Sequence, residues 1–202
     1  MLLYGAGGHA KILIECLNAC QIGILGIFDD APVQFNFQQV PLLGSYQHNI
    51  YPEKACLISI GDNNNRKKVS LKIKHAFGKI IHPSALFSPS ALLGEGSVIF
   101  HQAVIQAEAI IGKHVVLNTG SITEHDCLLE DFVHLAPGAI LCGNVHVGEG
   151  TLIGAGAVVL PNISIGKWCT IGAGSVVNRD IPDFSTVAGV PAKIIKQQKT
   201  IK

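Results

Sequence analysis

The stretch that decides the fold is residues 105–129, IQAEAIIGKHVVLNTGSITEHDCLL, in which a large apolar residue returns at every sixth position until Thr123 interrupts the series. The same register extends in both directions, and sixteen of its seventeen positions are large and apolar. These positions are Ile81, Phe87, Leu93, Ile99, Ile105, Ile111, Leu117, Thr123, Leu129, Leu135, Leu141, Val147, Ile153, Val159, Ile165, Ile171 and Val177. A fixed period of six predicts one short strand and one turn in each hexad.

Small residues dominate the position four places after each large one, and no insertion breaks the register between Ile81 and Val177. Three hexads close one triangular coil, and stacked coils bury a continuous column of aliphatic side chains. A sandwich of short strands, the alternative, does not require a strict period of six. The spacing therefore predicts a parallel β-helix with between five and six coils in a domain that spans residues 81–202.

Residues 1–80 alternate between strand and helix patterns, which predicts a small parallel sheet in an α/β domain. Strands are predicted at residues 2–4, 24–28 and 57–60, and the last is followed by a polar loop over residues 61–66. Two amphipathic helices are predicted, the first marked by Ala10, Leu13, Ile14 and Leu17 and the second by Val69, Ile73 and Phe77.

Composition excludes several classes of protein. The formal net charge is +1 with no basic run, so nucleic acid is not an expected partner. No run of about 18 apolar residues is present, so membrane insertion is not expected either. The six cysteines form no CxxC pair and no secretory leader precedes them, which predicts reduced thiols in a cytoplasmic protein.

The polar stretch TEHDC, residues 123–127, is where the repeat departs from its apolar rhythm. His125 and Asp126 are the third and fourth residues of their hexad, which form the corner turn, so both side chains should project from a corner of the prism. An isolated corner histidine is usually a solvated surface group, but a rigid backbone and an adjacent carboxylate are what a general base requires. We expect the Thr123 hydroxyl to brace this turn.

A second motif, GAGGHA at residues 5–10, follows a predicted strand and precedes a predicted helix, with Asp29 about twenty residues further on. The α/β half is too small for the two mononucleotide units of an NAD site. It can still hold one nucleotide, because glycines let the backbone approach a pyrophosphate and a helix N-terminus stabilises its charge. Asp29 or Asp30 can accept hydrogen bonds from a base or ribose. The alternative is that the glycines serve only a tight strand-to-helix turn.

The hexad run resembles the hexapeptide-repeat acyltransferases, whose β-helix is left-handed, and AGVPAK at residues 188–193 resembles their closing segment. Residues 118–145, NTGSITEHDCLLEDFVHLAPGAILCGNV, closely resemble nucleotide-sugar acetyltransferases that modify a 4-amino sugar in bacterial glycan pathways. The likeness extends to YGAGGHAK at 4–11, FDD at 28–30 and GDNNNRKK at 61–68. It implies a Rossmann-like sugar-nucleotide-binding domain followed by a left-handed β-helix acetyltransferase domain.

The resemblance also implies roles for individual residues. It makes His125 the catalytic base and Asp126, where relatives carry Glu, the acid that orients and polarises it. His134 would contact the acetyl group of acetyl-CoA, and the backbone N–H of Gly143 would hold the thioester oxyanion. The donor's pantetheine arm would be lined by Ala155 and Ala173, which are eighteen residues and one coil apart.

For the acceptor, the resemblance implies that Gly7, Gly8 and His9 contact the phosphates or sugar. Asp29 and Asp30 would contact the uracil, and Gly61 the nucleotide. Family members are homotrimers with sites between subunits, so His125 and His134 need not meet within one chain. The implied reaction is acetyl-CoA-dependent N-acetylation of the 4-amino group of a UDP-linked amino-deoxy sugar.

Three alternatives remain at this stage. The first is O-acetylation of a sialic acid or related sugar, and the second is a non-enzymatic, trimeric nucleotide-binding scaffold. The third, a zinc enzyme like the β-helical carbonic anhydrases, needs three converging histidines, and His82, His101, His114 and His146 are only scattered along the repeat. No metal is expected. The cysteines are predicted to pack in the core rather than act as nucleophiles, so direct transfer is preferred to an acyl-enzyme.

Overall fold

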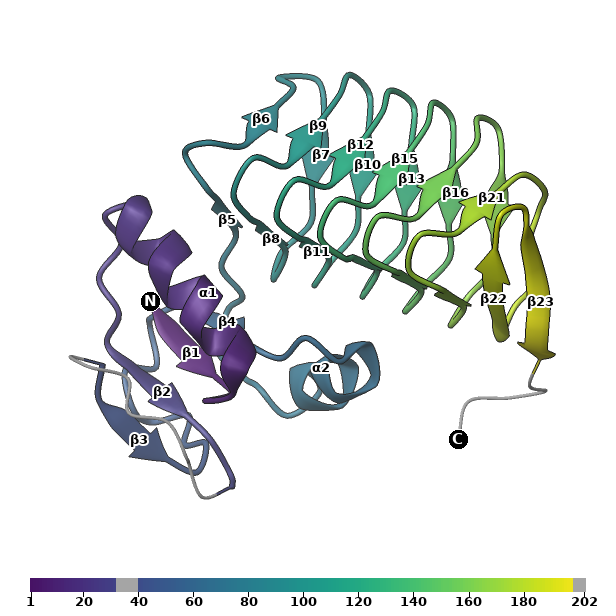
Figure 1. The fold of residues 1–202 in the computed structure, drawn as a ribbon. Helices are drawn as coiled ribbons and strands as arrows, with labels where there is room; N and C mark the ends of the chain where they lie inside the picture. The colour runs from purple at the N-terminus through teal and green to yellow at the C-terminus, as the bar shows by residue number, and fades with distance from the viewer. Residues whose placement is uncertain (32–39, 198–202) are drawn as a thin grey trace.

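A computed structural model describes residues 1–31 and 40–197. It shows a small α/β domain beside a long parallel β-helix (Figure 1). Residues 198–202, the end of the second predicted domain, lie outside the described residues, as do residues 32–39 of the first.

The N-terminal domain is a four-stranded parallel sheet with strand order β3-β2-β1-β4. Its strands are β1 (Leu2–Tyr4), β2 (Gly26–Phe28), β3 (Leu42–Gly44) and β4 (Cys56–Ile58), and its helices are α1 (Gly8–Ala19) and α2 (Asn63–Ser70). The side chains of β1 alternate between two clusters, because successive residues of a strand point to opposite faces. Leu3 packs with α1 residues such as Leu13, whereas Leu2 and Tyr4 pack with Val69 of α2.

Local details of this domain correct the sequence-based prediction. The second and third predicted strands are shorter than expected, and β3 was not predicted. The second helix was misplaced, since α2 occupies the predicted polar loop and only Val69 of its three marker residues lies inside it. Asp62 caps this helix by accepting the Asn65 N–H at 2.8 Å, which satisfies a donor that the first turn would otherwise leave free. Ile73 and Phe77 follow the helix instead of forming its face.

The β-helix is built from seventeen two-residue strands between residues 80 and 177. Sheet I contains β5 (Ile80–Ile81), β8 (Val98–Ile99), β11 (Val116–Leu117), β14 (His134–Leu135), β17 (Leu152–Ile153) and β20 (Thr170–Ile171). Sheet II contains β6 (Leu86–Phe87), β9 (Val104–Ile105), β12 (Ile122–Thr123), β15 (Ile140–Leu141), β18 (Val158–Val159) and β21 (Val176–Val177). Sheet III contains β7 (Leu92–Leu93), β10 (Ile110–Ile111), β13 (Leu128–Leu129), β16 (His146–Val147) and β19 (Ser164–Ile165).

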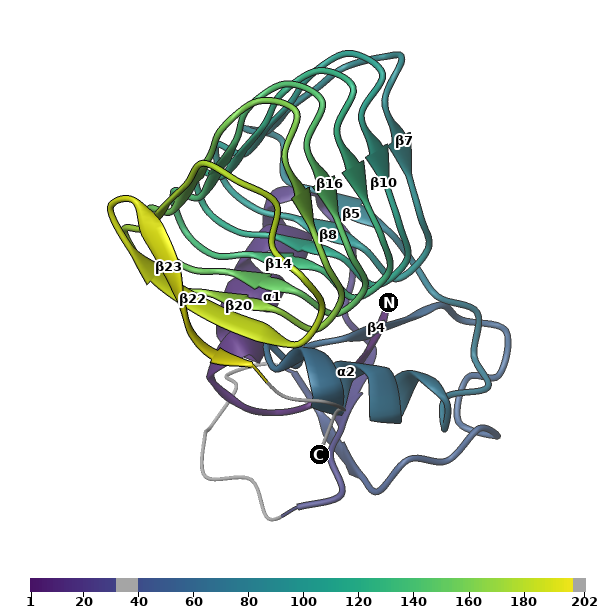
Figure 2. The same cartoon turned by 90° about the vertical axis from the view of Figure 1, so that its right-hand side faces the viewer.

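The register of the strands confirms the predicted period of six residues. Each strand pairs in parallel with the strand eighteen residues away, as Leu117 pairs with Leu135, so three hexads make one coil. The second residue of each strand is the large hexad residue, and these side chains form one continuous core. Seen from the C-terminal end in Figure 2, the chain runs clockwise through sheets I, II and III as it approaches the viewer, which is left-handed winding.

The predicted closing segment is an antiparallel hairpin at the end of sheet I. It consists of β22 (Ser185–Gly189) and β23 (Ala192–Gln197), joined through a cis Val190–Pro191 peptide bond. β22 pairs with β20 and therefore covers the edge of the last coil. An uncovered edge would offer unpaired N–H and C=O groups to other chains.

The N-terminal domain packs on the outer surface of sheet I (Figure 2). Val98 and Val116, which point outward from that sheet, are buried with Leu3 and Ala10 of the N-terminal domain. Hydrogen bonds reinforce this contact, because the buried Arg66 guanidinium donates to the carbonyl oxygens of both domains. The contact fixes the position of the N-terminal domain relative to the coils.

Candidate active site

The His125–Asp126 pair lies at the corner between sheets II and III, as the hexad register predicts. His125 Nδ1 is 2.7 Å from Asp126 Oδ2, and the two side chains are 61% and 56% exposed. A carboxylate only accepts hydrogen bonds, so Nδ1 carries a hydrogen, and in the neutral imidazole Nε2 then carries the lone pair. Asp126 has a φ of 60°, in the left-handed region that Asp adopts more readily than most residues. The corner thus presents an oriented base to solvent.

Gly143 lies one coil beyond His125 at the same corner. A Cβ on this residue would come within 2.6 Å of His125 Nε2, so only glycine leaves room for the imidazole in its present position. The Asn144 N–H donates to the His125 carbonyl at 2.9 Å, which ties the two coils together here. Among the described residues, the Gly143 N–H has no hydrogen-bond partner. A free amide therefore lies next to the candidate base.

The expectation for Thr123 is wrong. Its side chain is fully buried, and Oγ1 has no hydrogen-bond partner among the described residues. The hydroxyl therefore does not brace the turn that carries His125. A buried hydroxyl without a partner costs free energy relative to an aliphatic group.

A cavity of about 700 Å³ opens at the carboxyl ends of β1 and β4. The residues predicted to bind the sugar nucleotide all line it, although they come from three segments of the sequence. They are Gly7, Gly8, His9, Asp29, Asp30 and Gly61. In a parallel sheet these strand ends meet at one edge, which is where ligands bind in open α/β folds.

The two aspartates are already engaged within the cavity wall. Asp29 accepts the N–H groups of Ala6 at 2.6 Å and Ala31 at 2.9 Å, so it holds the glycine loop against the end of β2. Asp30 accepts the Tyr4 hydroxyl at 2.5 Å, and this bond holds the pKa of the Asp30 carboxyl below its usual value. Burial, followed by the same carboxylate, raises the pKa of the Tyr4 hydroxyl.

His134 lies on sheet I, where it contacts Gly61 and His9 of the cavity lining, and not on the corner that carries His125. Its Nδ1 is 3.2 Å from the Gly61 carbonyl oxygen and its Nε2 is 3.3 Å from Asn118 Nδ2. Burial and the nearby Arg66 charge lower the pKa of His134 to about 4. The same causes lower the pKa of His9 to about 4, and the two ring centroids are 6.3 Å apart. Both imidazoles are therefore neutral at neutral pH.

The residues predicted to hold the acetyl donor fall in three places. Ala155 and Ala173 stack on the corner between sheets I and II, where the Gly174 N–H donates to the Ala155 carbonyl at 2.9 Å. The prediction that Ala155 and Ala173 lie next to each other on one edge of the β-helix is confirmed. Gly143 lies at the other edge of sheet II and His134 on the outer surface of sheet I. One chain therefore does not bring His125 and Gly143 together with the remaining predicted residues.

Sequence reasoning missed Arg66, which is 1% exposed. Its guanidinium donates to the carbonyl oxygens of Ile60 and Gly61 in the N-terminal domain, and to those of His114 and Phe132 in the β-helix. An arginine in a run of polar residues gives no sequence signal for burial. Only the capping position of Asp62 could have indicated that this run is a helix with one inward face.

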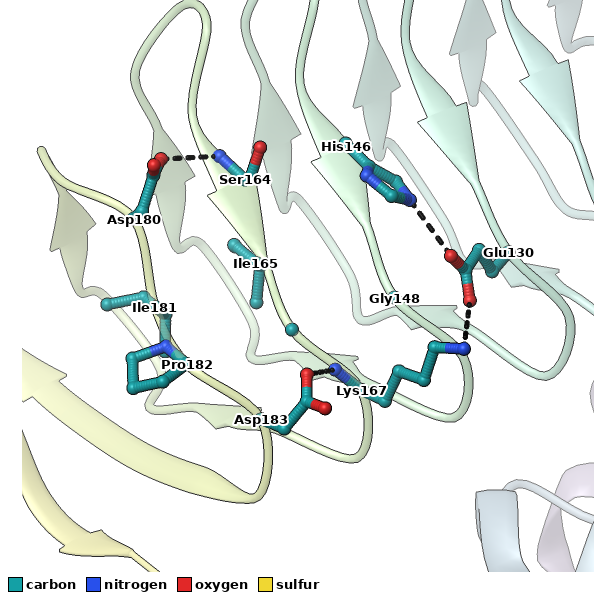
Figure 3. A pocket seen from close by; sticks show the side chains of 11 residues that line it. Glu130, His146, Gly148, Ser164, Ile165, Lys167, Asp180, Ile181, Pro182 and Asp183 are labelled. Carbon is teal, nitrogen blue, oxygen red and sulfur yellow. Dashed lines mark hydrogen bonds and ion pairs between the residues drawn. The ribbon is translucent and has the colours of Figure 1, made fainter.

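A second cavity, of about 380 Å³, lies on sheet III near the end of the β-helix (Figure 3). Glu130 lies at its edge, with Oε1 3.0 Å from His146 Nε2 and Oε2 3.6 Å from Lys167 Nζ. Burial alone would raise the pKa of Glu130, but the Glu149 N–H, His146 and Lys167 together hold it below its usual value. None of the predicted site residues lines this cavity.

Within residues 1–31 and 40–197, no group of three or more His, Cys, Asp or Glu side chains has an arrangement suited to a metal ion. The described part of the chain also has no helix long and apolar enough to cross a membrane.

Family models match both parts of the chain. Residues 1–73 match the PglD N-terminal domain, and residues 144–179 match the bacterial transferase hexapeptide repeats. UDP-N-acetylbacillosamine N-acetyltransferase from Bacillus subtilis is 42% identical over 106 residues, which cover 48% of this chain and 49% of that protein. The match thus spans about half the length of that curated relative.

Solved structures match over nearly the whole chain. Perosamine N-acetyltransferase from Caulobacter crescentus, in complex with CoA and GDP-perosamine, is 38% identical with a TM-score of 0.92, covering 97% of this chain and 96% of that one. The acetyltransferase domain of PglB from Neisseria gonorrhoeae, in complex with acetyl coenzyme A, is 38% identical with a TM-score of 0.90. That match covers 96% of this chain and 98% of the PglB domain.

A left-handed β-helix of hexads is the fold of the hexapeptide-repeat acyltransferases, and here it follows a small α/β domain. Within that class, the similarities over nearly the whole chain identify the family. The chain belongs to the PglD family of hexapeptide-repeat sugar N-acetyltransferases.

Proposed function

We propose that this protein transfers the acetyl group of acetyl-CoA to the 4-amino group of a UDP-linked amino-deoxy sugar in bacterial glycan biosynthesis. The oriented His125–Asp126 pair beside the unbonded Gly143 amide is the observation that carries the proposal. Residues 1–80 bind the sugar nucleotide and residues 81–202 perform the transfer. All six cysteines are free thiols, which is consistent with a reducing compartment, and we place the reaction in the cytoplasm.

The active enzyme is a homotrimer with its sites between subunits. Sheet II supports this arrangement, because its outward residues form a partly exposed aliphatic column. The column consists of Val104, Ile122, Ile140, Val158 and Val176. Three copies packed through sheet II around one axis bury this column and bring the II–III corner of each copy against the I–II corner of the next. His125 and Gly143 of one subunit then face Ala155, Ala173 and the sugar-nucleotide cavity of its neighbour.

The transfer proceeds in one ternary complex. His125 Nε2 takes a proton from the amine as its nitrogen attacks the thioester carbonyl carbon. The Gly143 N–H stabilises the oxyanion of the tetrahedral intermediate. The C–S bond then breaks, the CoA thiolate leaves, and it receives the proton from His125. Asp126 holds the imidazole in position throughout. His134 of the neighbouring subunit contacts the acetyl end of the donor.

Acceptor specificity tests the proposal directly. Purified protein with acetyl-CoA is expected to acetylate a UDP-linked 4-amino sugar with a higher kcat/KM than the GDP-linked equivalent, and not to acetylate free or CMP-linked sialic acids. Release of free CoA thiol reports the rate. Preference for a sialic acid would establish O-acetylation instead. Failure to turn over any acceptor, with no binding of acetyl-CoA or a sugar nucleotide in calorimetry, would favour the scaffold alternative.

The donor position gives a second expected result. Ala155 and Ala173 are exposed on the I–II corner, and a thin pantetheine amide chain gains most where backbone groups are accessible. Ala155→Trp or Ala173→Trp is expected to raise the KM for acetyl-CoA about 10-fold or more, which corresponds to the loss of one or two good contacts. The KM for the sugar nucleotide should change much less.

The matched control for bulk is His101→Trp. His101 occupies the same hexad position on the same corner, three coils before Ala155. Donor affinity should be unchanged in this variant. If both alanine variants form trimers and bind acetyl-CoA as the wild type does, the donor lies along another edge.

A further inference from the structure

Helix α2 contacts the β-helix through one face and lines the sugar-nucleotide cavity with the other. Its inner face holds the helix against the β-helix. Asn63 Nδ2 donates to the Gly150 carbonyl at 2.9 Å, Arg66 donates to the carbonyls of His114 and Phe132, and Lys67 forms an ion pair with Glu149. These bonds join a short helix of the N-terminal domain to successive coils of the other domain.

The other face of α2, together with the residues that follow it, forms a wall of the sugar-nucleotide cavity. Asn65, Lys68, Val69 and Lys72 line the cavity together with the glycines at the start of α1. Spacings of three and four residues place Asn65, Lys68 and Val69 on one side of α2, and Lys72 follows the helix. The N-terminus of α1 has no side-chain cap and no acidic residue in its first turn, so nothing competes there with a bound anion.

The charges of the cavity wall are unevenly compensated. Asp29 is satisfied by two backbone N–H groups, and Asp30 by the Tyr4 hydroxyl and by Lys72, whose Nζ lies 3.9 Å away. His9 is neutral because burial lowers its pKa to about 4. Lys68 is left as the cation of this wall that has no hydrogen bond or ion pair among the described residues.

We propose that the Lys68 ammonium binds the diphosphate of the sugar nucleotide, from the wall that faces the Gly7–Gly8 turn. The proposal rests on the proposed function and names the cation that its acceptor site requires. A diphosphate in this cavity meets backbone N–H groups on one side and the Lys68 ammonium on the other. Because Arg66 fixes the same helix to the β-helix, the bound phosphates take a set position relative to the coils.

Calorimetry with UDP and with uridine, on the full-length protein, separates this role from a general structural one. Lys68→Gln is expected to weaken UDP binding about 10- to 100-fold, the usual effect of losing a hydrogen bond to a charged group in a confined site. Binding of uridine, which has no phosphate, should not change. The dependence of UDP affinity on salt should also become shallower in the variant, because one ionic contact is gone. Lys68→Arg should retain most of the affinity.

Lys74→Gln is the matched control, because Lys74 is an exposed lysine shortly after α2 that does not line the cavity. It removes the same charge from the protein and should leave UDP binding unchanged. The proposal is overturned if Lys68→Gln binds UDP as the wild type does, if it weakens uridine and UDP equally, or if the wild type binds no UDP. The first two results leave acetyl transfer intact as the proposed function, whereas failure of acetyl transfer with normal UDP binding contradicts only the function.

Discussion

His125→Ala is expected to lower kcat by about 10²- to 10⁴-fold, the usual contribution of a general base. The KM values for both substrates should stay close to those of the wild type, because the side chain is exposed at a corner and supports no part of the core. Stopped-time assays of acetylated product at saturating substrates measure the effect, and circular dichroism with gel filtration checks the fold and assembly.

Substitutions at Gly143 and Asp126 test the geometry around His125 rather than the imidazole itself. Gly143→Ala leaves the imidazole chemically unchanged. The added Cβ of residue 143 would lie 2.6 Å from His125 Nε2, so the ring must move. Asp126→Asn keeps the shape of the corner but can stabilise the wrong imidazole tautomer, since an amide N–H can donate to Nδ1. Both variants are expected to lose kcat with little change in thermal stability.

The matched control for His125 is His101→Ala. His101 is the third residue of its hexad, as His125 is, but lies at the corner between sheets I and II. It stacks on His82 with ring centroids 3.8 Å apart and has no carboxylate partner among the described residues. Its variant should turn over normally. Near-wild-type kcat in a folded His125→Ala protein would rule out this histidine as the base.

Mixing two impaired variants is expected to restore activity under our proposal that each site takes His125 from one subunit and the donor edge from the next. His125→Ala lacks the base, and Ala155→Trp obstructs the donor at low acetyl-CoA. Each trimer that contains both variants has one site in about three that combines an intact His125 with an intact Ala155 on the neighbouring subunit, because the two variants must be adjacent in the required order. At low acetyl-CoA, activity should therefore approach about a third of the wild-type value, against about a tenth for Ala155→Trp alone and far less for His125→Ala alone.

The experiment uses differently tagged variants that are co-expressed, purified through both tags and weighed by native mass spectrometry. Wild-type and Ala155→Trp chains, mixed in the same way, control for exchange and tag effects. Mixed trimers with no more activity than the sum of their parents would place the whole site within one subunit. A monomeric wild-type protein with full activity would reject the shared site altogether.

The hexad repeat was predictable because it is a local and repeated constraint. Each coil must place a large residue inward, small residues beside it and a tight turn at each corner, so the pattern is visible in the sequence without knowledge of other contacts. The corner positions of His125 and Asp126 followed from the same register. The N-terminal domain was predicted less well, because its short strands and α2 depend on packing against distant residues. The three asparagines that begin α2 have poor helix propensity, yet tertiary contacts and the Asp62 cap make the run NNNRKK helical.

The sequence by itself determined the β-helix, the glycine-rich turn before α1 and the family of the protein, because periodicity and short motifs involve only neighbouring residues. Tertiary structure alone decided how the parts of the site are divided. Arg66 finds its carbonyl partners 48 and 66 residues away, and the contact of His134 with Gly61 spans 73 residues. Such contacts produce no periodic pattern in the sequence, because they depend on how the N-terminal domain packs against sheet I. That packing places His134 against the N-terminal domain and leaves His125 exposed on a corner of the β-helix.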